Sequence, residues 1–297
     1  ILNGTILRVC HFRKPHFHPI QRIGEILFPG NVQLMTKNPE PYLQDIIDRH
    51  LPARQPDGQS ARVLKLGSDL MDWAQAFFVE LRDVGAHARK TSTPRSSHVK
   101  LLLLLSNDCH RNAGGIRSSY ESLYGYLIER YPRVTKHGMA LRIRQNGLDI
   151  DVFPARLLSG HTDDHVLYRS DDNSLLQTNL VRHVDEVVNA GRGRETRLLK
   201  AWFQQHEIKA PSLYVDFLVP FKLVHDVKPK NDNLHNNFLH MLRKIAQRDF
   251  NPLLEDLADP ANEENLFSEL MSVEDKKRAI RSAQQALMAR NLTAIIG

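Results

Sequence analysis

The stretch Ser97–Ser106 reads SHVKLLLLLS and contains the longest purely apolar run of the chain, Leu101–Leu105. Five consecutive leucines are typical of a short strand that is buried on both faces of a sheet. Immediately before this run, His98 and Lys100 alternate with Val99, so the two polar side chains share one face of the expected strand. The stretch therefore predicts a buried strand that begins with a polar pair.

Outward from this strand, the pattern predicts an α+β fold in which a mixed first part is followed by a helical second part. Apolar residues recur at helical spacing from Val63 to Val84, which predicts one long amphipathic helix before Gly85. The pair Asn146-Gly147 is a strong hairpin signal between expected strands at 139–145 and 148–154. Further helices are expected at 42–50, 118–131, 180–190, 195–206, 211–217, 234–248 and 273–290.

Seven prolines interrupt the first 60 residues, which predicts an irregular N-terminal arm at 1–60. Beyond the arm we expect two domains, at 61–180 and 181–297, with a ligand cleft between them. The arm also contains Cys10, His11, His16 and His18, but their spacing matches no familiar zinc pattern.

The composition is that of a folded globular protein, because 41% of the 297 residues are hydrophobic and 25% are charged. No apolar run approaches the roughly 20 residues that cross a bilayer, and no secretory signal is recognisable, so we expect a cytoplasmic protein without a membrane partner. Cys10 and Cys109 are too few for a disulfide framework and are expected to be free thiols. The net charge of +6 favours phosphate-bearing partners without naming one.

Several short motifs follow one another along the chain in an order that resembles a known family. Gly85-Ala86 precedes the polar pair of the leucine strand, and LDIDVFPA follows at 148–155. From about Val63 to its end, the chain resembles the polymerase-β-type nucleotidyltransferases, and more closely the bacterial cGAS/DncV-like enzymes (CD-NTases) of anti-phage signalling. The further matching motifs are SGHTDDH at 159–165, QTN at 177–179, RLLKAW at 197–202, PSLY at 211–214 and DPAN at 259–262.

The resemblance implies a nucleotidyltransferase palm, with a mixed sheet and flanking helices, followed by a helical lobe. In this family a Gly-Ser turn holds the triphosphate, and three carboxylates hold two Mg²⁺ ions that activate the attacking hydroxyl and neutralise the departing pyrophosphate. In this chain the serine corresponds to Ala86, the Asp-x-Asp pair corresponds to His98 and Lys100, and only the third carboxylate is kept, as Asp151. The exchange raises the local formal charge by about three, which predicts a site that repels Mg²⁺.

Lys100 and Asp151 are expected on neighbouring strands, where an ion pair between them would occupy the place of a metal. Asp149 shares the face of Asp151 and is either a second metal ligand or a residue that faces water. The resemblance implies nucleotide contacts at Gly85, Gln177, Thr178, Asn179, Lys200 and Tyr214. Three of these also have a structural interpretation, namely Lys200 as a solvated helix lysine, Tyr214 as a core residue and Asn179 as the N-cap of the helix from Leu180.

Three functions remain open, and we favour the first of them. The first is a pseudoenzyme that binds a nucleoside triphosphate, or an effector protein, without turnover. The second is an active Mg²⁺-dependent nucleotidyltransferase that makes a cyclic or linear oligonucleotide or modifies RNA ends, with Asp151 and Asp149 holding one ion. The third is a nucleic-acid-binding module that uses the basic residues Arg8, Arg13, Lys14 and Arg22 of the arm and Arg192, Arg194 and Arg197.

Overall fold

The computed structural model describes residues 39–49, 57–93, 98–109, 114–145, 147–158, 162–227 and 233–297. All of these residues lie in one compact unit. The predictions for the cysteine and histidines of the arm, for its basic residues and for residues 159–161 concern parts of the chain outside these ranges.

A seven-stranded mixed sheet is built around the leucine strand β2 (Val99–Leu105). On one side β2 pairs antiparallel with β1 (Phe78–Asp83), and on the other it pairs parallel with β5 (Leu148–Leu157). The predicted hairpin is confirmed, because β5 also pairs antiparallel with β4 (Ala140–Gln145) across the turn at Gly147. The remaining strands are β3 (Val134–His137) beside β4, β6 (His165–Arg169) beside β5, and β7 (Ser174–Thr178) beside β6.

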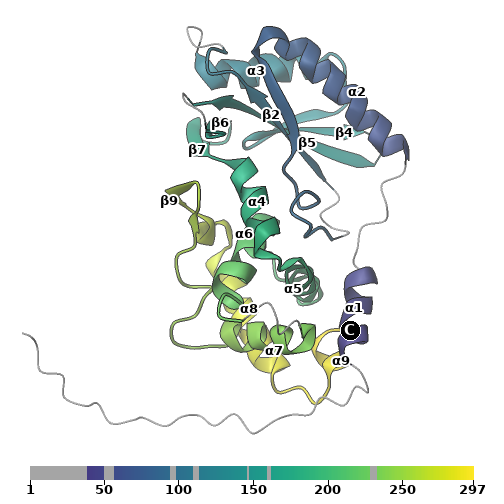
Figure 1. The fold of residues 1–297 in the computed structure, drawn as a ribbon, viewed down its shortest axis with the longest axis vertical. Helices are drawn as coiled ribbons and strands as arrows, with labels where there is room; N and C mark the ends of the chain where they lie inside the picture. Colours follow the sequence, from purple (N-terminus) through teal and green to yellow (C-terminus); the bar gives the residue numbers. More distant parts are fainter. Residues whose placement is uncertain are drawn as a thin grey trace, which may run out of the picture. The chain divides into compact units, whose positions relative to one another are not determined.

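Alternation along β2 divides the apolar residues between the two faces of the sheet. Leu101, Leu103 and Leu105 pack in a core with residues of α2 (Asp57–Ala74) and α3 (Gly115–Ile128). Figure 1 shows both helices on the same side of the sheet. Leu102 and Leu104 belong to a second, smaller core on the opposite face. Both faces of β2 are therefore covered, as the leucine run predicts.

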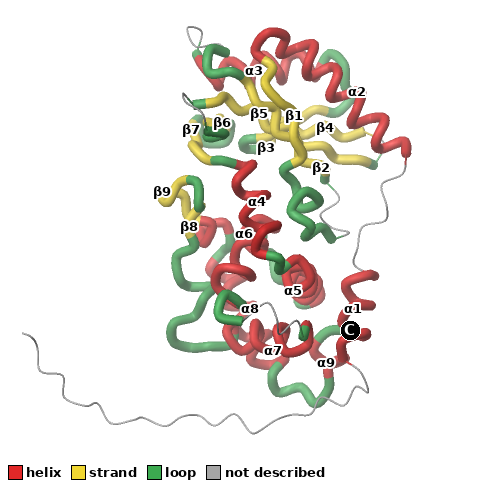
Figure 2. Tube along the Cα trace, in the orientation of Figure 1, coloured by secondary structure: helices red, strands yellow, loops and turns green. Residues whose placement is uncertain are grey.

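The chain becomes helical after β7, where α4 (Leu180–Ala190) begins (Figures 1 and 2). The expected helices from this point on are confirmed, with ends that differ by a few residues. The domain boundary predicted at residue 180 stays a prediction. The elements that follow are α5 (Gly193–Gln205), α6 (Ser212–Leu218), a π-helical turn (Val219–Leu223), α7 (Leu234–Ile245), the β8–β9 hairpin (Ala258–Asp259 and Asn262–Leu266), α8 (Val273–Ala286) and α9 (Leu292–Ile295).

Part of the predicted N-terminal arm is regular structure. Residues Pro39–Arg49 form α1, which packs against α5 and α7 through buried residues that include Leu43 and Ile47. The hydroxyl of Tyr42 donates a hydrogen bond to the carbonyl of Ile296 at 2.7 Å, so α1 also lies beside the C-terminal end. The helix expected at 42–50 within the irregular arm is therefore confirmed, with its start three residues earlier.

The long helix predicted from Val63 to Val84 is also wrong, because α2 ends at Ala74. Gln75 has a φ of 47° and opens a short 3₁₀ turn, after which the chain forms β1. As strand β1, this segment pairs with the edge of β2, whose backbone groups would otherwise lack partners on that side. Leu81 packs against Gly67 of α2, where a Cβ would meet it at 3.3 Å, and this close approach seats the helix on the strand.

No helix within the described ranges is long and apolar enough to cross a membrane. Cys109 is buried and is a free thiol, as predicted, whereas Cys10 lies outside those ranges. Burial is the main reason that the pKa of the Cys109 thiol is raised.

The leucine strand should dominate the stability of the fold. Leu103 is fully buried, so Leu103→Ala is expected to lower the free energy of unfolding by about 2–5 kcal/mol. Leu64 on α2 is 73% exposed, and Leu64→Ala should change that free energy by less than about 0.5 kcal/mol. Urea unfolding of the two variants checks this, and similar losses in both would contradict a core centred on β2.

Candidate nucleotide-binding site

A row of charged side chains crosses three strands on the face of the sheet opposite α2 and α3. The row contains Lys100 of β2 and His98, which directly precedes β2, and both alternate with residues of the core under those helices. In β4, Leu141 and Ile143 point into that core, so Arg142 belongs to the opposite face. The other members of the row are Arg144 on β4 and Asp149 and Asp151 on β5. The pairing of β2 with β5 therefore brings His98 and Lys100 close to Asp149 and Asp151, as the sequence predicts.

Asp151 is bound by an arginine from the neighbouring strand. Arg142 lies opposite Asp151 in the β4–β5 pair, with its Nε 2.7 Å from Oδ1 and its Nη2 3.0 Å from Oδ2. This bidentate pair is largely buried, since Asp151 is only 2% exposed. The hydrogen bond with Asp151 is the main reason that the pKa of Arg142 is raised. Both oxygens of Asp151, which the resemblance matches to the family's third carboxylate, are thus occupied by a guanidinium group.

The ion pair predicted between Lys100 and Asp151 does not form among the described residues, although the two lie opposite each other in the β2–β5 register. Arg142 reaches the carboxylate instead, because its longer, forked side chain matches both oxygens. The Lys100 Nζ lies 6.0 Å from the centre of the Phe153 ring. Burial, together with the charge of Arg89, lowers the pKa of the Lys100 ammonium, while Asp151 acts in the opposite direction.

Asp149 is paired in the same way as Asp151. Its two carboxylate oxygens accept hydrogen bonds from Arg144 at 2.8 and 3.0 Å, and this interaction is the main reason that its pKa is lowered. His98 lies between the two carboxylates, with Nε2 3.6 Å from Asp149 and Nδ1 3.9 Å from Asp151. The second proposed metal ligand is therefore also held by an arginine.

A buried carboxylate joins the turn after β1 to the helices α5 and α6. Asp216 is fully buried and lies 2.7 Å from Arg89 Nε and 2.5 Å from Lys200 Nζ. Lys200 also donates to the Ser212 hydroxyl at 2.8 Å and to the Thr91 carbonyl at 3.0 Å. Burial lowers the pKa of Lys200. Lys200 is thus a buried structural cation of the site, so the interpretation as a solvated helix lysine is wrong.

A cavity of about 720 Å³ is lined by His98 and Lys100 and by Arg89 and Lys200. Its size falls within the range of pockets that enclose a small-molecule ligand. The described lining residues do not include Arg142, Asp149, Asp151 or Asp216. Ala86, which the resemblance matches to the family's serine, lines the cavity. The neighbouring Gly85 lies close to Lys100, because a Cβ placed on Gly85 would lie 3.4 Å from the Lys100 Cβ. Five of the described lining residues are cationic, namely Arg89, Lys100, Lys200, Lys209 and Arg278, and Glu207 is the one carboxylate among the described lining.

The side chains present do not fit a two-metal centre. Mg²⁺ needs several oxygen ligands in near-octahedral geometry. Here Asp151 and Asp149 are each bound by an arginine, and Lys100 takes the place of a carboxylate. Within the part of the chain that the structure describes, no group of three or more His, Cys, Asp and Glu side chains could hold a metal ion.

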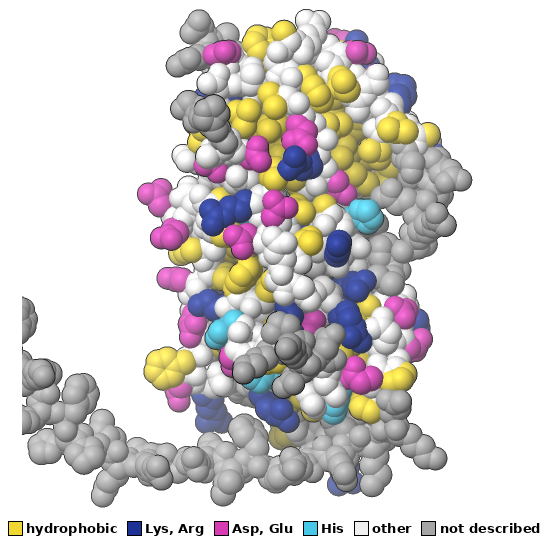
Figure 3. All heavy atoms as spheres, in the orientation of Figure 1, with side chains coloured by type: hydrophobic (Ala, Val, Ile, Leu, Met, Phe, Trp, Pro, Cys, Tyr) yellow, Lys and Arg dark blue, Asp and Glu magenta, His cyan; other side chains and the backbone are white. Residues whose placement is uncertain are grey.

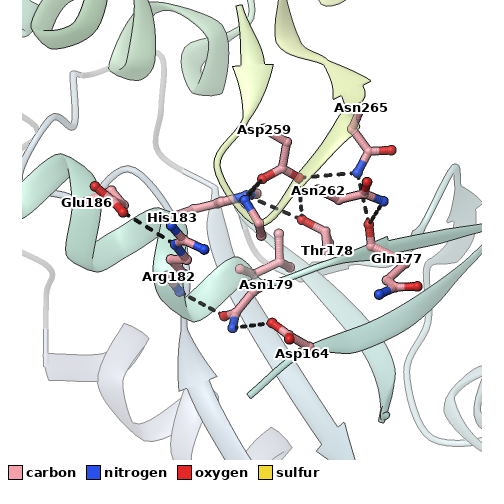
Figure 4. Close-up of polar contacts among 12 residues, drawn as sticks. Asp164, Gln177, Thr178, Asn179, Arg182, His183, Glu186, Asp259, Asn262 and Asn265 are labelled. Atoms are coloured by element: carbon pink, nitrogen blue, oxygen red, sulfur yellow. Dashed lines mark hydrogen bonds and ion pairs between the residues drawn. The ribbon is translucent and has the colours of Figure 1, made fainter. Parts of the chain in front are cut away.

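The QTN motif lies away from the cavity lining and contacts the DPAN motif instead, as Figure 4 shows. Thr178 donates to Asp259 at 2.6 Å, and His183 Nε2 lies 2.7 Å from the other oxygen of Asp259. The carbonyl of Gln177 accepts hydrogen bonds from Asn262 and Asn265, and Asn179 caps α4 by accepting from the Arg182 backbone. The motif therefore ties β7 and α4 to the β8–β9 hairpin, and the N-cap interpretation of Asn179 is confirmed.

Tyr214 is fully buried, and its burial raises the pKa of the phenol. Ser212 and Val215 of the same helix line the cavity, whereas Tyr214 is not among the described lining residues. The core interpretation of Tyr214 is therefore confirmed, and a direct contact between Tyr214 and a nucleobase stays a prediction.

The three arginines proposed as a basic stripe are engaged by protein acceptors. Arg192 lies 3.1 Å from Glu195, Arg194 donates to Gln44 at 3.1 Å, and Arg197 donates to the Gly193 carbonyl at 3.2 Å. On the face drawn in Figure 3, the Lys and Arg side chains of the described residues are interspersed with Asp and Glu. This mixed pattern does not favour a nucleic-acid stripe on that face.

Sequence reasoning missed Arg142 and the pair formed by Arg89 and Asp216. The signal for Arg142 was present, because a two-residue hairpin at Asn146-Gly147 places Arg142 opposite Asp151 by register alone. No comparable signal exists for Arg89 and Asp216, which are separated by 127 residues in the sequence.

Solved structures with a similar fold include CD-NTases. CdnG from Bradyrhizobium diazoefficiens, in complex with GTP, gives a TM-score of 0.65 at 10% identity, covering 84% of this chain and 91% of that chain. CdnC from E. coli MS115-1, in complex with HORMA-deltaN, gives 0.63 at 17% identity, covering 84% and 90%. The CdnE cyclic dinucleotide synthase from Elizabethkingia meningoseptica, with GTP and Apcpp, gives 0.59 at 15% identity, covering 83% and 96%.

No family model and no curated protein matches the sequence. The mixed sheet with its flanking helices and the helices that follow nevertheless have the fold of the polymerase-β-type nucleotidyltransferases in its cGAS/DncV-like form. The fold predicted from the sequence motifs is therefore confirmed.

The Arg142–Asp151 pair should contribute far more to the free energy of unfolding than the exposed Arg144–Asp149 pair. Arg142→Ala leaves a buried carboxylate without its partner and is expected to lower the free energy of unfolding by about 3 kcal/mol. Arg144, whose side chain is 57% exposed, provides the matched control, and Arg144→Ala should cost less than about 1 kcal/mol. Urea unfolding at pH 7 measures both, and equal effects would show that Asp151 does not depend on Arg142.

The Asp259 contacts should make stability depend on pH. Burial acts to raise the pKa of Asp259, but the hydrogen bond and charge of His183, with the Thr178 hydrogen bond, outweigh it, so the pKa is lowered. A lowered pKa means that the stabilisation is complete well above the unfolded value of about 3.9 and is lost as the pH falls through the folded value.

Asp259→Asn should therefore lower the free energy of unfolding by about 2 kcal/mol at pH 7, and its deficit relative to the unsubstituted protein should shrink below about pH 4. Denaturant titrations between pH 3 and pH 7 check this. A deficit that stays constant across this range would contradict the assignment to a charged Asp259.

Proposed function

We propose that this chain binds a nucleoside triphosphate in the cationic cavity and does not join one nucleotide to another. The fold supports the ligand class, since the CdnG and CdnE structures contain GTP. The observation that carries the proposal is the bidentate contact of Arg142 with Asp151, beside a lysine at a position where the family has a carboxylate. The chain is then a nucleotide-binding pseudoenzyme.

The cationic groups of the cavity suit phosphate recognition. Lys100, Lys200 and Arg89 come from β2, α5 and the turn after β1, so three separate elements contribute cations to the cavity lining. An ammonium group binds a phosphate as a point charge, and a guanidinium group can donate two parallel hydrogen bonds. Each of these groups has a protein acceptor or a buried environment that fixes its position before the ligand arrives.

The same groups provide no route to nucleotidyl transfer. Two divalent ions would activate an attacking hydroxyl and neutralise the leaving pyrophosphate. A lysine at this position contributes charge but does not coordinate the hydroxyl, and Asp151 has both oxygens engaged by Arg142. The alternative of an active enzyme using Asp151 and Asp149 is disfavoured by the same contacts, because Arg144 also holds Asp149. An effector partner, a role in anti-phage signalling and a cytoplasmic location stay predictions.

The proposal predicts binding without turnover. Isothermal titration should detect binding of at least one of the four nucleoside triphosphates, whereas radiolabelled nucleotides with Mg²⁺ or Mn²⁺ should give no oligonucleotide and no pyrophosphate. Product formation that Asp151→Asn abolishes would contradict the proposal and support the active enzyme.

Variants that restore the family's metal ligands test whether Arg142 prevents metal binding at Asp151. Ala86→Ser, His98→Asp and Lys100→Asp restore the family's groups, but Arg142 still occupies Asp151, so this triple variant should bind Mn²⁺ weakly. Adding Arg142→Ala frees the carboxylate and should raise Mn²⁺ affinity at least tenfold, measured by electron paramagnetic resonance. Equal Mn²⁺ affinity in the triple and fourfold variants would show that Arg142 is not what excludes the metal.

A further inference from the structure

The cavity holds more positive charge than a metal-bound nucleotide would balance. Its described lining has five cationic side chains against Glu207, and Asp216 lies behind Arg89 and Lys200. A free nucleoside triphosphate carries about four negative charges near pH 7, whereas its magnesium complex carries about two. With Glu207 and Asp216 taken into account, the cavity has about three positive charges, midway between the charges of the two forms, so a preference depends on where the cations lie.

Protein cations also occupy the place where the family's metals would meet the phosphates. Lys100 lies opposite Asp151 in the parallel register, and Arg142 covers that carboxylate from the other side. A divalent ion brought to this place by the nucleotide would be repelled by these two cations, and Asp151 already has both oxygens engaged by Arg142. Such an ion would gain no ligand from Asp151 and would neutralise phosphate charge that Lys100 could otherwise meet.

From these contacts we propose that the cavity takes the metal-free nucleoside triphosphate in preference to its magnesium complex, with Lys100 supplying the charge that a metal would supply. This inference rests on the proposed function, because it names the ionic form of the same ligand. The family requires Mg²⁺ for catalysis, whereas in this chain Mg²⁺ would weaken the binding of the nucleotide.

Lys100 is the side chain through which the preference is best tested. Arg89 and Lys200 are both held by Asp216, and Arg142 is held by Asp151, so their charges are partly compensated. Among the described residues, Lys100 has no carboxylate within ion-pair distance, and its nearest recorded contact of this kind is the Phe153 ring. Its ammonium is therefore free to meet a phosphate oxygen.

The experiment is isothermal titration with ATP, GTP, CTP, UTP and inorganic tripolyphosphate, each in EDTA and in excess MgCl₂ at matched ionic strength. Tripolyphosphate shows whether the phosphates alone are recognised. The variant is Lys100→Gln, which removes the charge and keeps most of the side-chain length. The matched control is Lys136→Gln on β3, which removes one lysine that pairs with Glu121 away from the cavity.

The expected result is a Kd at least about tenfold lower in EDTA than in Mg²⁺, for the unsubstituted chain and for Lys136→Gln alike. In Lys100→Gln the metal-free affinity should fall and the ratio of the two Kd values should approach one. Equal or tighter binding in Mg²⁺ by the unsubstituted chain would overturn the inference, while the observed binding would leave the proposed function in place.

Two other outcomes also decide the matter. A tenfold ratio that persists in Lys100→Gln would overturn the role given to Lys100. Failure of all four nucleotides to bind in either buffer would remove the proposed function and this inference together. The comparison of EDTA with Mg²⁺ needs only the unsubstituted chain, so it stands even where a variant does not fold.

Discussion

Arg142 and Asp151 form a two-hydrogen-bond ion pair across the β4–β5 hairpin, and the character of the site follows from it. The hairpin register fixes the two residues opposite each other, and alternation places both on the face away from α2 and α3. Because the pair is largely buried, removing one partner leaves an uncompensated charge. The carboxylate that a metal would need is therefore a structural part of the sheet.

The fold keeps a cationic cavity, while the Arg142–Asp151 ion pair occupies the carboxylate that a metal ion would need. The sheet, the turn at Gly85 and the buried contacts of Asp216 with Arg89 and Lys200 still build a cationic cavity at the edge of the sheet. A shared fold does not by itself carry the shared chemistry, which depends on particular side chains in the site. Here the positions that the resemblance matches to two metal ligands are His98 and Lys100, so under the proposed function the cavity binds phosphate and does not transfer it.

Local pattern predicted most of the elements that matter to the site. The leucine run gave β2, the Asn-Gly turn gave the β4–β5 hairpin, and period-two alternation placed Lys100 and Asp151 on one face. The segment Phe78–Asp83 could not be predicted in the same way, because its spacing also suits a helix and only the free edge of β2 decides for a strand. The contacts of Asp216 and Asp259 join residues far apart in the sequence, so periodicity carried no information about them.

The central claim is that protein cations stand where divalent metals would stand. A crystal structure of the unsubstituted chain grown with a nucleoside triphosphate and MnCl₂, with an anomalous difference map at the manganese edge, tests it most directly. The account predicts triphosphate density beside the Lys100 ammonium, no anomalous peak at Asp151 and an intact contact of Arg142 with that carboxylate. A manganese ion bound by Asp151 and a phosphate oxygen, with Arg142 displaced, would contradict it.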